Sequence, residues 1–343
     1  MNYMARRKSN KIEPAAMRLT FELPSSMVNG THYIDLSQCA SLVNRRFYRQ
    51  GLNWAVAGFR LNVQETAVSG AAVTVSKLPN TWILSNSWEK SFRVWRRMND
   101  EAMAENESIR PRFLDFKVYA DGVHHAAGFG ANLRPWSTGG HFSPGEWESS
   151  KIYYPNTASS GAVGTVETEI VAVGTNYSGV GASGHDAVSM IEGYANSRSL
   201  PNVLDPNTPN DAIESDGSKP ENWMTAIFND GTNQYAEVID VLTDENNIAP
   251  YPFENDGVNV DTMYPNGELQ APGMELVDQS WVNAVMTDPN RAGLGTTTRL
   301  MGSNFPCGLI RLDIFGFSTD TNLFIDLVPG HHRGYLAESM VEM

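Results

Sequence analysis

Short runs in which apolar and polar residues alternate make up most of the chain. In "MRLTFELP", the side chains of Leu19, Phe21 and Leu23 fall on one face and Pro24 ends the run, which predicts a strand with one buried face. Gly58 interrupts the longer run "NWAVAGFRLNV" and predicts a bulge or a close approach of backbones. Further strands are predicted in "THYIDLSQC", "AAVTVSKLP", "RFLDFKVYAD", "EWESSKIYYP", "GTVETEIVAVGT", "WMTAIFND", "YAEVIDVLT", "CGLIRLDIFGF" and "NLFIDLVPG".

One stretch, "SNSWEKSFRVWRRMND", has helical spacing instead. Its apolar stripe, at positions i, i+4 and i+7, consists of Trp88, Phe92 and Trp95. Its other side carries four positive charges, on Lys90, Arg93, Arg96 and Arg97. We expect this helix to be capped by Ser85 or Ser87 and to end near Glu105. A second helix is predicted in "GHDAVSMIEGYANS", with Asp186 as its cap.

Eight to ten strands, one or two short helices and long loops predict an all-β protein. The expected architecture is a single eight-stranded jelly-roll sandwich over residues 18–343. Residues 1–17 are polar and basic and are expected to form a disordered N-terminal arm. The stretch 201–280 holds 16 Asp and Glu against one Lys, with many Pro and Asn, which predicts acidic surface loops.

The charge is distributed unevenly along the chain. Residues 1–117 carry 17 Lys and Arg against 10 Asp and Glu, a net charge of +7, whereas residues 118–343 carry 8 against 29, a net charge of −21. A basic half suggests a polyanionic partner for one surface, and an acidic half suggests a solvated surface elsewhere. No run of apolar residues is long enough to span a membrane, the N-terminal stretch lacks the apolar region of a secretory signal, and Cys39 and Cys307 are expected to be buried free thiols.

Catalytic and metal-binding patterns are missing from the sequence, so we predict no enzyme and no cofactor. Ser183, His185 and Asp186 are too close in sequence to converge as a triad. The pairs His124–His125 and His331–His332, placed on strands, would point to opposite faces and would not chelate jointly. The Asp-rich runs "LDPNTPND" and "FENDGVNVD" offer oxygen ligands for calcium, which stays a minor alternative because neither matches an EF-hand loop.

The basic segments are more informative. The arm holds Arg6, Arg7, Lys8 and Lys11, and the run "NRRFYRQ" interleaves Arg45, Arg46 and Arg49 with two aromatic residues. Positive charge binds phosphates and aromatic rings stack on unpaired bases, so both groups are candidate nucleic-acid-binding residues. The alternative for "NRRFYRQ" is a surface turn whose aromatic rings are buried.

The order of these features resembles the capsid proteins of small circular single-stranded DNA viruses. The resemblance rests on the basic start, the run "FYRQGLNWAVAGFRL", the Trp-rich helix, "RPWSTGGHFSPGEWESSKIYYPN" and the tail "LFIDLVPGHHRGYLAESM". It implies a jelly roll that self-assembles with copies of itself into an icosahedral shell inside the host cell. It also implies a virion in which a basic arm contacts the packaged genome. Because such capsids often have a longer Arg-rich arm, we expect Arg45, Arg46, Arg49 and the arginines of the basic helix to share this contact.

For the basic helix, we expect the aromatic stripe to pack on the sandwich and the positive face to form a subunit interface, with Lys90, Arg93, Arg96 and Arg97 as its candidates. A function of another class stays open, namely a carbohydrate-binding or carbohydrate-cleaving β-sandwich. Its site would consist of Trp136 and Trp147, expected to be exposed, with Glu146 nearby on a strand that also carries Glu148.

Overall fold

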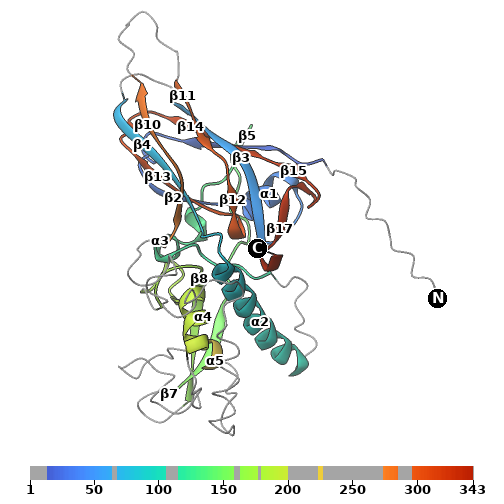
Figure 1. The fold of residues 1–343 in the computed structure, drawn as a ribbon. Helices are drawn as coiled ribbons and strands as arrows, with labels where there is room; N and C mark the ends of the chain where they lie inside the picture. The colour runs from blue at the N-terminus through green and yellow to red at the C-terminus, as the bar shows by residue number, and fades with distance from the viewer. Residues whose placement is uncertain are drawn as a thin grey trace, which may run out of the picture.

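The computed structural model describes residues 14–63, 68–105, 115–157, 163–176, 179–199, 223–226, 273–284 and 296–342. Strands dominate these residues, and nearly all of them pair antiparallel, so the prediction of an all-β protein is confirmed. Figure 1 shows two large sheets in the upper part of the molecule and a smaller group of helices and strands below them.

The first large sheet has the strand order β1-β14-β3-β11. These strands are β1 (Arg18–Leu23), β14 (Thr321–Leu327), β3 (Leu52–Val63) and β11 (Thr296–Met301). Two short strands, β12 (Asn304–Phe305) and β17 (Ala337–Ser339), pair with the first residues of β3. The register between β14 and β3 shifts just beyond Gly58, so the irregularity predicted at this glycine is confirmed.

The second large sheet has the strand order β10-β4-β13-β2. Its strands are β10 (Glu275–Ala284), β4 (Val68–Lys77), β13 (Leu309–Phe315) and β2 (Gly30–Asp35). The two sheets share one hydrophobic core, to which β1 contributes Leu19, Phe21 and Leu23 as its alternation predicts. Burial of this apolar surface is the main stabilising contribution to the sandwich.

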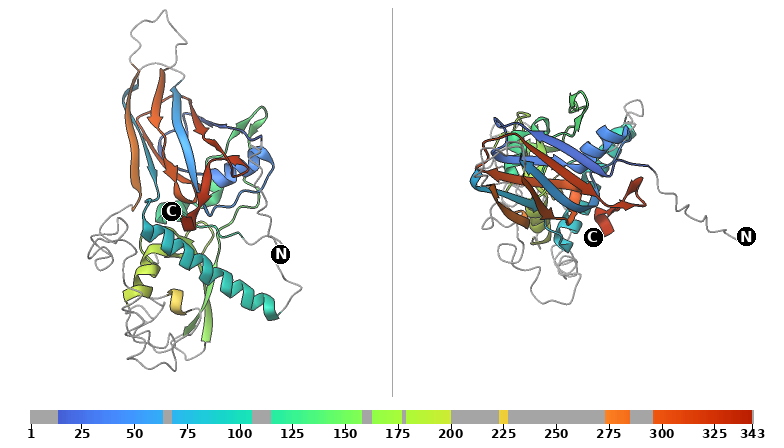
Figure 2. Two further views of the ribbon diagram at one scale, coloured as in Figure 1. Left: turned by 45° about the vertical axis from the view of Figure 1, so that its right-hand side comes forward. Right: turned by 90° about the horizontal axis from the view of Figure 1, so that it is seen from above.

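The second group of elements lies below the sheets (Figure 2), and its hydrophobic cluster also includes Tyr33 of β2 and Leu309 of β13. Helix α2 (Trp82–Glu105) packs there beside α4 (Met190–Ser199), and Trp88 and Trp95 of the predicted stripe are buried in the cluster. The other elements of this group are α3 (Gly122–Ala127), β7 (Ile152–Thr157), β8 (Val163–Val171), β9 (Asp186–Ser189) and α5 (Trp223–Ala226). Strands β8 and β9 pair in parallel, unlike those of the large sheets.

The remaining short elements connect and flank the sheets. They are α1 (Leu36–Asn44), the hairpins of β5 (Trp136–Ser137) with β6 (Gly140–His141) and of β15 (Pro329–Gly330) with β16 (Gly334–Tyr335), and the 3-10 turns η2 (Phe129–Ala131), η3 (Pro306–Gly308) and η4 (Met340–Glu342). Within the described part of the chain, no helix is both long and apolar enough to cross a bilayer. Both cysteines are buried free thiols, as predicted.

Several predictions of local structure are wrong because side chains cap the backbone. The run "THYIDLSQC" is a strand only to Asp35, where the carboxylate accepts hydrogen bonds from the N–H groups of Ser37 and Gln38 and begins α1. In "GHDAVSMIEGYANS", Asp186 begins β9, and the hydroxyl of Ser189 accepts the N–H of Glu192 at the start of α4.

The caps predicted for the basic helix are also wrong. Helix α2 begins at Trp82, and the Thr81 hydroxyl accepts the N–H of Leu84 at 3.4 Å. Ser85 and Ser87 lie inside the helix and are buried, where their hydroxyls donate to the carbonyl oxygens of Met340 and Leu84.

Other predicted strands are replaced by different structure. The described part of "RFLDFKVYAD" has no strand, only an isolated bridge between Tyr119 and Val171. The described residues of "WMTAIFND" form α5, whereas "YAEVIDVLT" lies outside the described residues. The acidic stretch 201–280 is not entirely surface loop, because Trp223 is fully buried and β10 begins at Glu275.

The N-terminal arm lies mostly outside the described residues. The described chain begins at Pro14, and residues expected to belong to the arm already contact the fold: the N–H of Ala16 donates to the side chain of Asn44 at the end of α1, and the carbonyl of Met17 accepts from the N–H of Leu327 in β14. Residues 18–343 as a single domain stay a prediction.

Candidate functional site

The predicted nucleic-acid-binding residues fall into two groups in the structure. Arg6, Arg7, Lys8 and Lys11 lie outside the described residues. Arg45, Arg46 and Arg49 follow α1, where Arg45 ends the helix in the left-handed conformation (φ 56°). Arg46 donates to the carbonyl of Pro14 at 3.1 Å, which brings the start of the described chain next to this turn.

Tyr48 anchors the turn between Arg45 and Gly51. It is 1% exposed, its N–H donates to the Ser41 hydroxyl, and its own hydroxyl donates to the carbonyl of Arg333 at 3.0 Å. Its ring packs in the core against Trp54 and Tyr335. Because Tyr48 and Gln50 are buried while Arg49 is exposed, the turn presents the Arg49 side chain outward.

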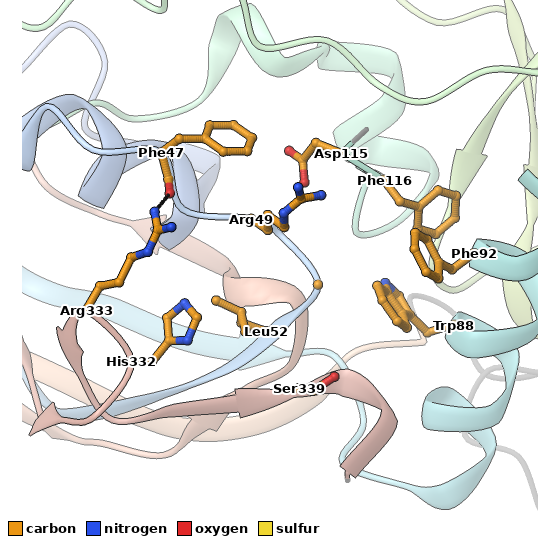
Figure 3. A pocket seen from close by; sticks show the side chains of 11 residues that line it. Phe47, Arg49, Leu52, Trp88, Phe92, Asp115, Phe116, His332, Arg333 and Ser339 are labelled. Atoms are coloured by element: carbon orange, nitrogen blue, oxygen red, sulfur yellow. Dashed lines mark hydrogen bonds between the residues drawn. The ribbon is translucent and has the colours of Figure 1, made fainter. Parts of the chain in front are cut away.

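A pocket with a volume of about 510 Å³ opens beside this turn. It lies between residues 47–52, helix α2, residues 115–116 and the C-terminal residues 332–339, so segments far apart in sequence meet in it (Figure 3). Its lining residues are Phe47, Arg49, Gly51, Leu52, Trp88, Phe92, Asp115, Phe116, His332, Arg333 and Ser339.

Aromatic rings form one side of the pocket. Trp88 and Phe92 of α2 stack with ring centroids 5.2 Å apart, and Phe116 meets both of them at 5.9 Å. Gly51 makes this arrangement feasible, because a Cβ at this position would lie 2.4 Å from Cζ2 of Trp88. Offset-stacked and edge-on aromatic pairs of this kind are favourable beyond the area they bury.

The opposite side of the pocket is basic. The guanidinium of Arg333 donates to the carbonyl of Phe47 at 2.6 Å and lies near His332, while Arg49 lies between the two sides (Figure 3). Both arginines are exposed. A mouth with two guanidinium groups next to an aromatic wall suits a ligand that is flat and apolar at one end and anionic at the other.

One acid lies among these groups. The side chain of Asp115 is 5% exposed, and burial raises its pKa, an effect that the nearby charges of Lys117 and Arg49 oppose. Lys117 forms an ion pair with Asp115 at 3.0 Å and also lies 4.6 Å from the centre of the Trp147 ring. The charge of Asp115 is therefore compensated by Lys117.

The basic face of α2 lies apart from this pocket, which α2 lines with Trp88 and Phe92 alone. Arg93 forms an ion pair with Glu89, and Arg96 forms one with Asp100 at 3.6 Å, both within the helix. The ammonium of Lys90 lies 5.8 Å from the centre of the Tyr194 ring on α4, within the same chain. Arg93, Arg96 and Arg97 are exposed and form the outward basic surface of the helix.

The structure does not present the predicted sugar site as expected. Trp136 is 41% exposed and packs edge-on against His141 in the β5–β6 hairpin. Trp147, however, is half-buried and donates to the carboxylate of Asp35 at 2.9 Å, so its indole N–H is directed inward. The strand predicted for Glu146 and Glu148 is also wrong, because residues 146–151 have no strand.

The histidine pair of α3 and the residues Ser183 and His185 contact other parts of the same chain. Both histidines of the first pair are buried on α3, not on a strand. The Ser183 hydroxyl donates to Glu169 at 2.8 Å, and His185 lies beside Lys151, so Ser183 and His185 turn to different partners. No group of three or more metal-ligating side chains occurs within the described ranges.

Sequence reasoning missed the C-terminal contribution to the pocket. His332 and Arg333 belong to "PGHHRG", which was considered only as a histidine pair. A basic turn between two glycines, directly after a strand, was the available signal, and Arg333 adopts φ 51° in this turn. Asp115 and Ser339 carried no comparable signal.

Comparisons with protein-family models, with curated proteins and with solved structures find no match for this chain.

Proposed function

We propose that this chain is a viral coat protein. Copies of it assemble inside the host cell into a closed icosahedral shell, the virion, which encloses a single-stranded DNA genome. The observation that carries this proposal is the nested pairing of the eight long strands of the two large sheets.

Along the chain, these eight strands are β1, β2, β3, β4, β10, β11, β13 and β14. The first pairs with the eighth, the second with the seventh, the third with the sixth and the fourth with the fifth, all antiparallel. Such nesting, closed by the β14–β3 and β13–β4 pairs, is the connectivity expected of a jelly roll built from two Greek keys. It supports the eight-stranded jelly roll that the sequence predicts.

Jelly rolls occur in capsid proteins but also in lectins and cupins, so the fold alone does not decide the function. The uneven charge favours a coat protein. The basic arm and the turn of Arg45, Arg46 and Arg49 suit an inner surface that faces nucleic acid, and the acidic later part of the chain suits an outer surface that keeps particles apart.

Exposed aromatic residues on the second sheet also favour assembly. Trp281 of β10 and Phe315 of β13 are 63% and 72% exposed, and both lie opposite Ala72 of β4, on the outer face of the sheet. Neighbouring strands are about 4.8 Å apart, so the two rings flank Ala72 across roughly 10 Å. Large exposed apolar groups of this kind are typical of protein–protein interfaces, and we assign this one to a neighbouring copy of the chain.

Negative-stain electron microscopy of the purified protein tests the proposal. We expect uniform closed shells at moderate salt, with the absorbance ratio at 260 and 280 nm raised by enclosed nucleic acid. A monodisperse small species with protein-only absorbance would refute the coat-protein function. It would favour the carbohydrate alternative, for which exposed Trp136 is the starting point.

The arm is tested by deleting residues 1–13, which leaves the hydrogen bonds of Ala16 and Met17 intact. We expect shells with less nucleic acid, because four of the candidate cations are removed. Replacing Arg93, Arg96 and Arg97 by Gln tests the proposed subunit interface, and here we expect fewer shells. Arg299→Gln, an exposed arginine on β11, serves as the matched control for lost charge.

A further inference from the structure

We propose that the pocket between Arg49, Arg333 and the aromatic side of α2 binds one extruded base of a single-stranded nucleic acid, with the adjoining phosphate on the two arginines. This inference rests on the proposed function, because the packaged genome would supply the strand. The inference goes beyond the proposed function by assigning the contact to a defined pocket in the described part of the chain.

The pocket has the size and composition of a ligand site. Its volume of about 510 Å³ falls in the range of small-molecule pockets, roughly 300–1,000 Å³. Apolar and aromatic side chains line it together with a few polar ones, which is the usual composition of such sites. Four separate segments of the chain form its walls, and the Tyr48–Arg333 and Arg333–Phe47 hydrogen bonds hold two of them together.

The aromatic side is suited to a base. Phe92 is half-buried, and Trp88 and Trp95 stack on it with ring centroids 5.2 and 6.3 Å away, so its ring is held in place while part of it remains accessible. Bases stack on aromatic side chains whatever their identity, because each base has a π face. Leu52 lies between the two sides of the pocket (Figure 3).

The basic side is suited to a phosphate. Arg333 uses one guanidinium nitrogen to bind the Phe47 carbonyl, which orients the planar group at the mouth. Arginine binds phosphate through paired N–H groups and is the preferred residue for this contact. The Asp115 carboxylate also lines the pocket and lies beside Arg49 (Figure 3).

A single strand fits this arrangement better than a duplex. Paired and stacked bases in a duplex do not expose their faces, whereas an unpaired base can be turned out and stacked on protein rings. The ligand is therefore a strand with at least one free base, recognised by stacking and charge and not by its sequence.

The test separates base contacts from charge contacts. Fluorescence anisotropy measures the affinity of the full-length protein for a labelled single-stranded 12-mer, for an abasic strand of the same length and for the matching duplex. We expect the wild-type protein to bind the base-bearing strand at least about five-fold more tightly than the abasic strand, as one stacked base would give. Phe92→Leu keeps an apolar side chain but removes the aromatic face, and we expect it to abolish this preference.

The arginines are tested in the same assay. The double variant Arg49→Gln with Arg333→Gln is expected to weaken binding of every strand about ten-fold or more at 100 mM salt, whereas Arg299→Gln on β11 changes it less than two-fold. Phe142→Leu, a half-buried ring outside the pocket, is the matched control for Phe92→Leu. A thermal midpoint unchanged from wild type verifies that each variant is folded.

Equal affinity of the wild-type protein for base-bearing and abasic strands would overturn the proposal, as would an unchanged preference in Phe92→Leu. Electron microscopy of the same preparations keeps the two proposals distinguishable. Shells without a base preference would refute the pocket alone, whereas a base preference without shells would refute the coat-protein function and leave the pocket supported.

Discussion

Gly51 lies so close to the indole ring of Trp88 that a Cβ at residue 51 would be 2.4 Å from Cζ2 and 2.9 Å from Cη2 of that ring. This contact joins the turn that precedes β3 to helix α2, and it brings the basic turn and the aromatic stripe to the same pocket. The two features that stood out in the sequence as separate signals are therefore neighbours in the fold.

We expect Gly51→Ala to destabilise the protein by about 1–3 kcal/mol, because Trp88 is buried and cannot move away without displacing Phe116 and Phe92. Urea unfolding measures the change. Gly130→Ala is the matched control, because a Cβ at residue 130 has no heavy atom within 4 Å. Equal stability of the two variants would show that the Trp88 ring is free to adjust.

Trp95 tests how much the helix contributes to stability. Its side chain is 8% exposed and packs against Phe116 at 5.6 Å. Trp95→Ala is expected to cost about 3–5 kcal/mol, the loss typical of a buried aromatic residue. Trp136→Ala removes the same residue type from an exposed hairpin and should change the free energy of unfolding by less than about 1 kcal/mol. A midpoint near wild type for Trp95→Ala would show that α2 is peripheral to the folded unit.

The regular parts of the fold could be predicted because alternation reports burial directly. Leu19, Phe21 and Leu23 alternate with polar residues and are all buried, and the stripe of Trp88 and Trp95 is buried as its spacing predicts. These signals are local, since each depends on which face of one element is apolar. They predict that an element exists, but not which others it meets.

The pocket could be predicted only in part, because its walls come together through non-local contacts. Arg49 was a candidate from its basic and aromatic neighbours, whereas Arg333 joins the site through a hydrogen bond to Phe47, 286 positions away. Side-chain capping of the backbone also overrides the alternation of apolar and polar residues that predicts a strand. Asp35, a single carboxylate that accepts two backbone N–H groups, turned a predicted strand into the start of α1.

The exposed rings on the second sheet give a prediction about assembly. Replacing Trp281 and Phe315 by Ser is expected to leave the thermal midpoint within a few degrees of wild type, because both side chains are largely exposed. The same double variant should form few or no shells, since it removes the apolar centre of the proposed contact between copies. Electron microscopy and sedimentation measure the outcome. Met27→Ser, which also replaces an exposed apolar residue, controls for reduced surface hydrophobicity. Normal shells from the double variant would show that this face is not part of the interface between copies.

His124 predicts a dependence of stability on pH. The histidine is fully buried and stacks on Tyr33 at 4.3 Å. Its Nδ1 lies 3.0 Å from the N–H of Ala120 and therefore accepts, so the proton is on Nε2, which donates to Asn132 at 2.8 Å. Protonating Nδ1 would direct its N–H group at the N–H group of Ala120. Burial accordingly lowers the pKa of His124 to about 4, although the nearby charge of Asp121 acts in the opposite direction.

Because the pKa is lower in the folded state than the ordinary value of 6.5, the unfolded chain binds more protons between pH 6.5 and pH 4. The contribution of neutral His124 is therefore complete above pH 6.5 and is lost as the pH falls to about 4, by an amount on the order of 3 kcal/mol. Asp35 opposes this trend, since burial raises its pKa to about 6 and its charged form becomes costly as the pH rises towards that value.

The informative quantity is thus the difference in the free energy of unfolding between wild type and His124→Gln, not the wild-type curve alone. Urea unfolding at pH 7.5 and pH 4.5 should show wild type losing more stability than His124→Gln, whereas His141→Gln, on the exposed hairpin, should follow wild type. Parallel curves for wild type and His124→Gln would mean that His124 is protonated without cost in the fold.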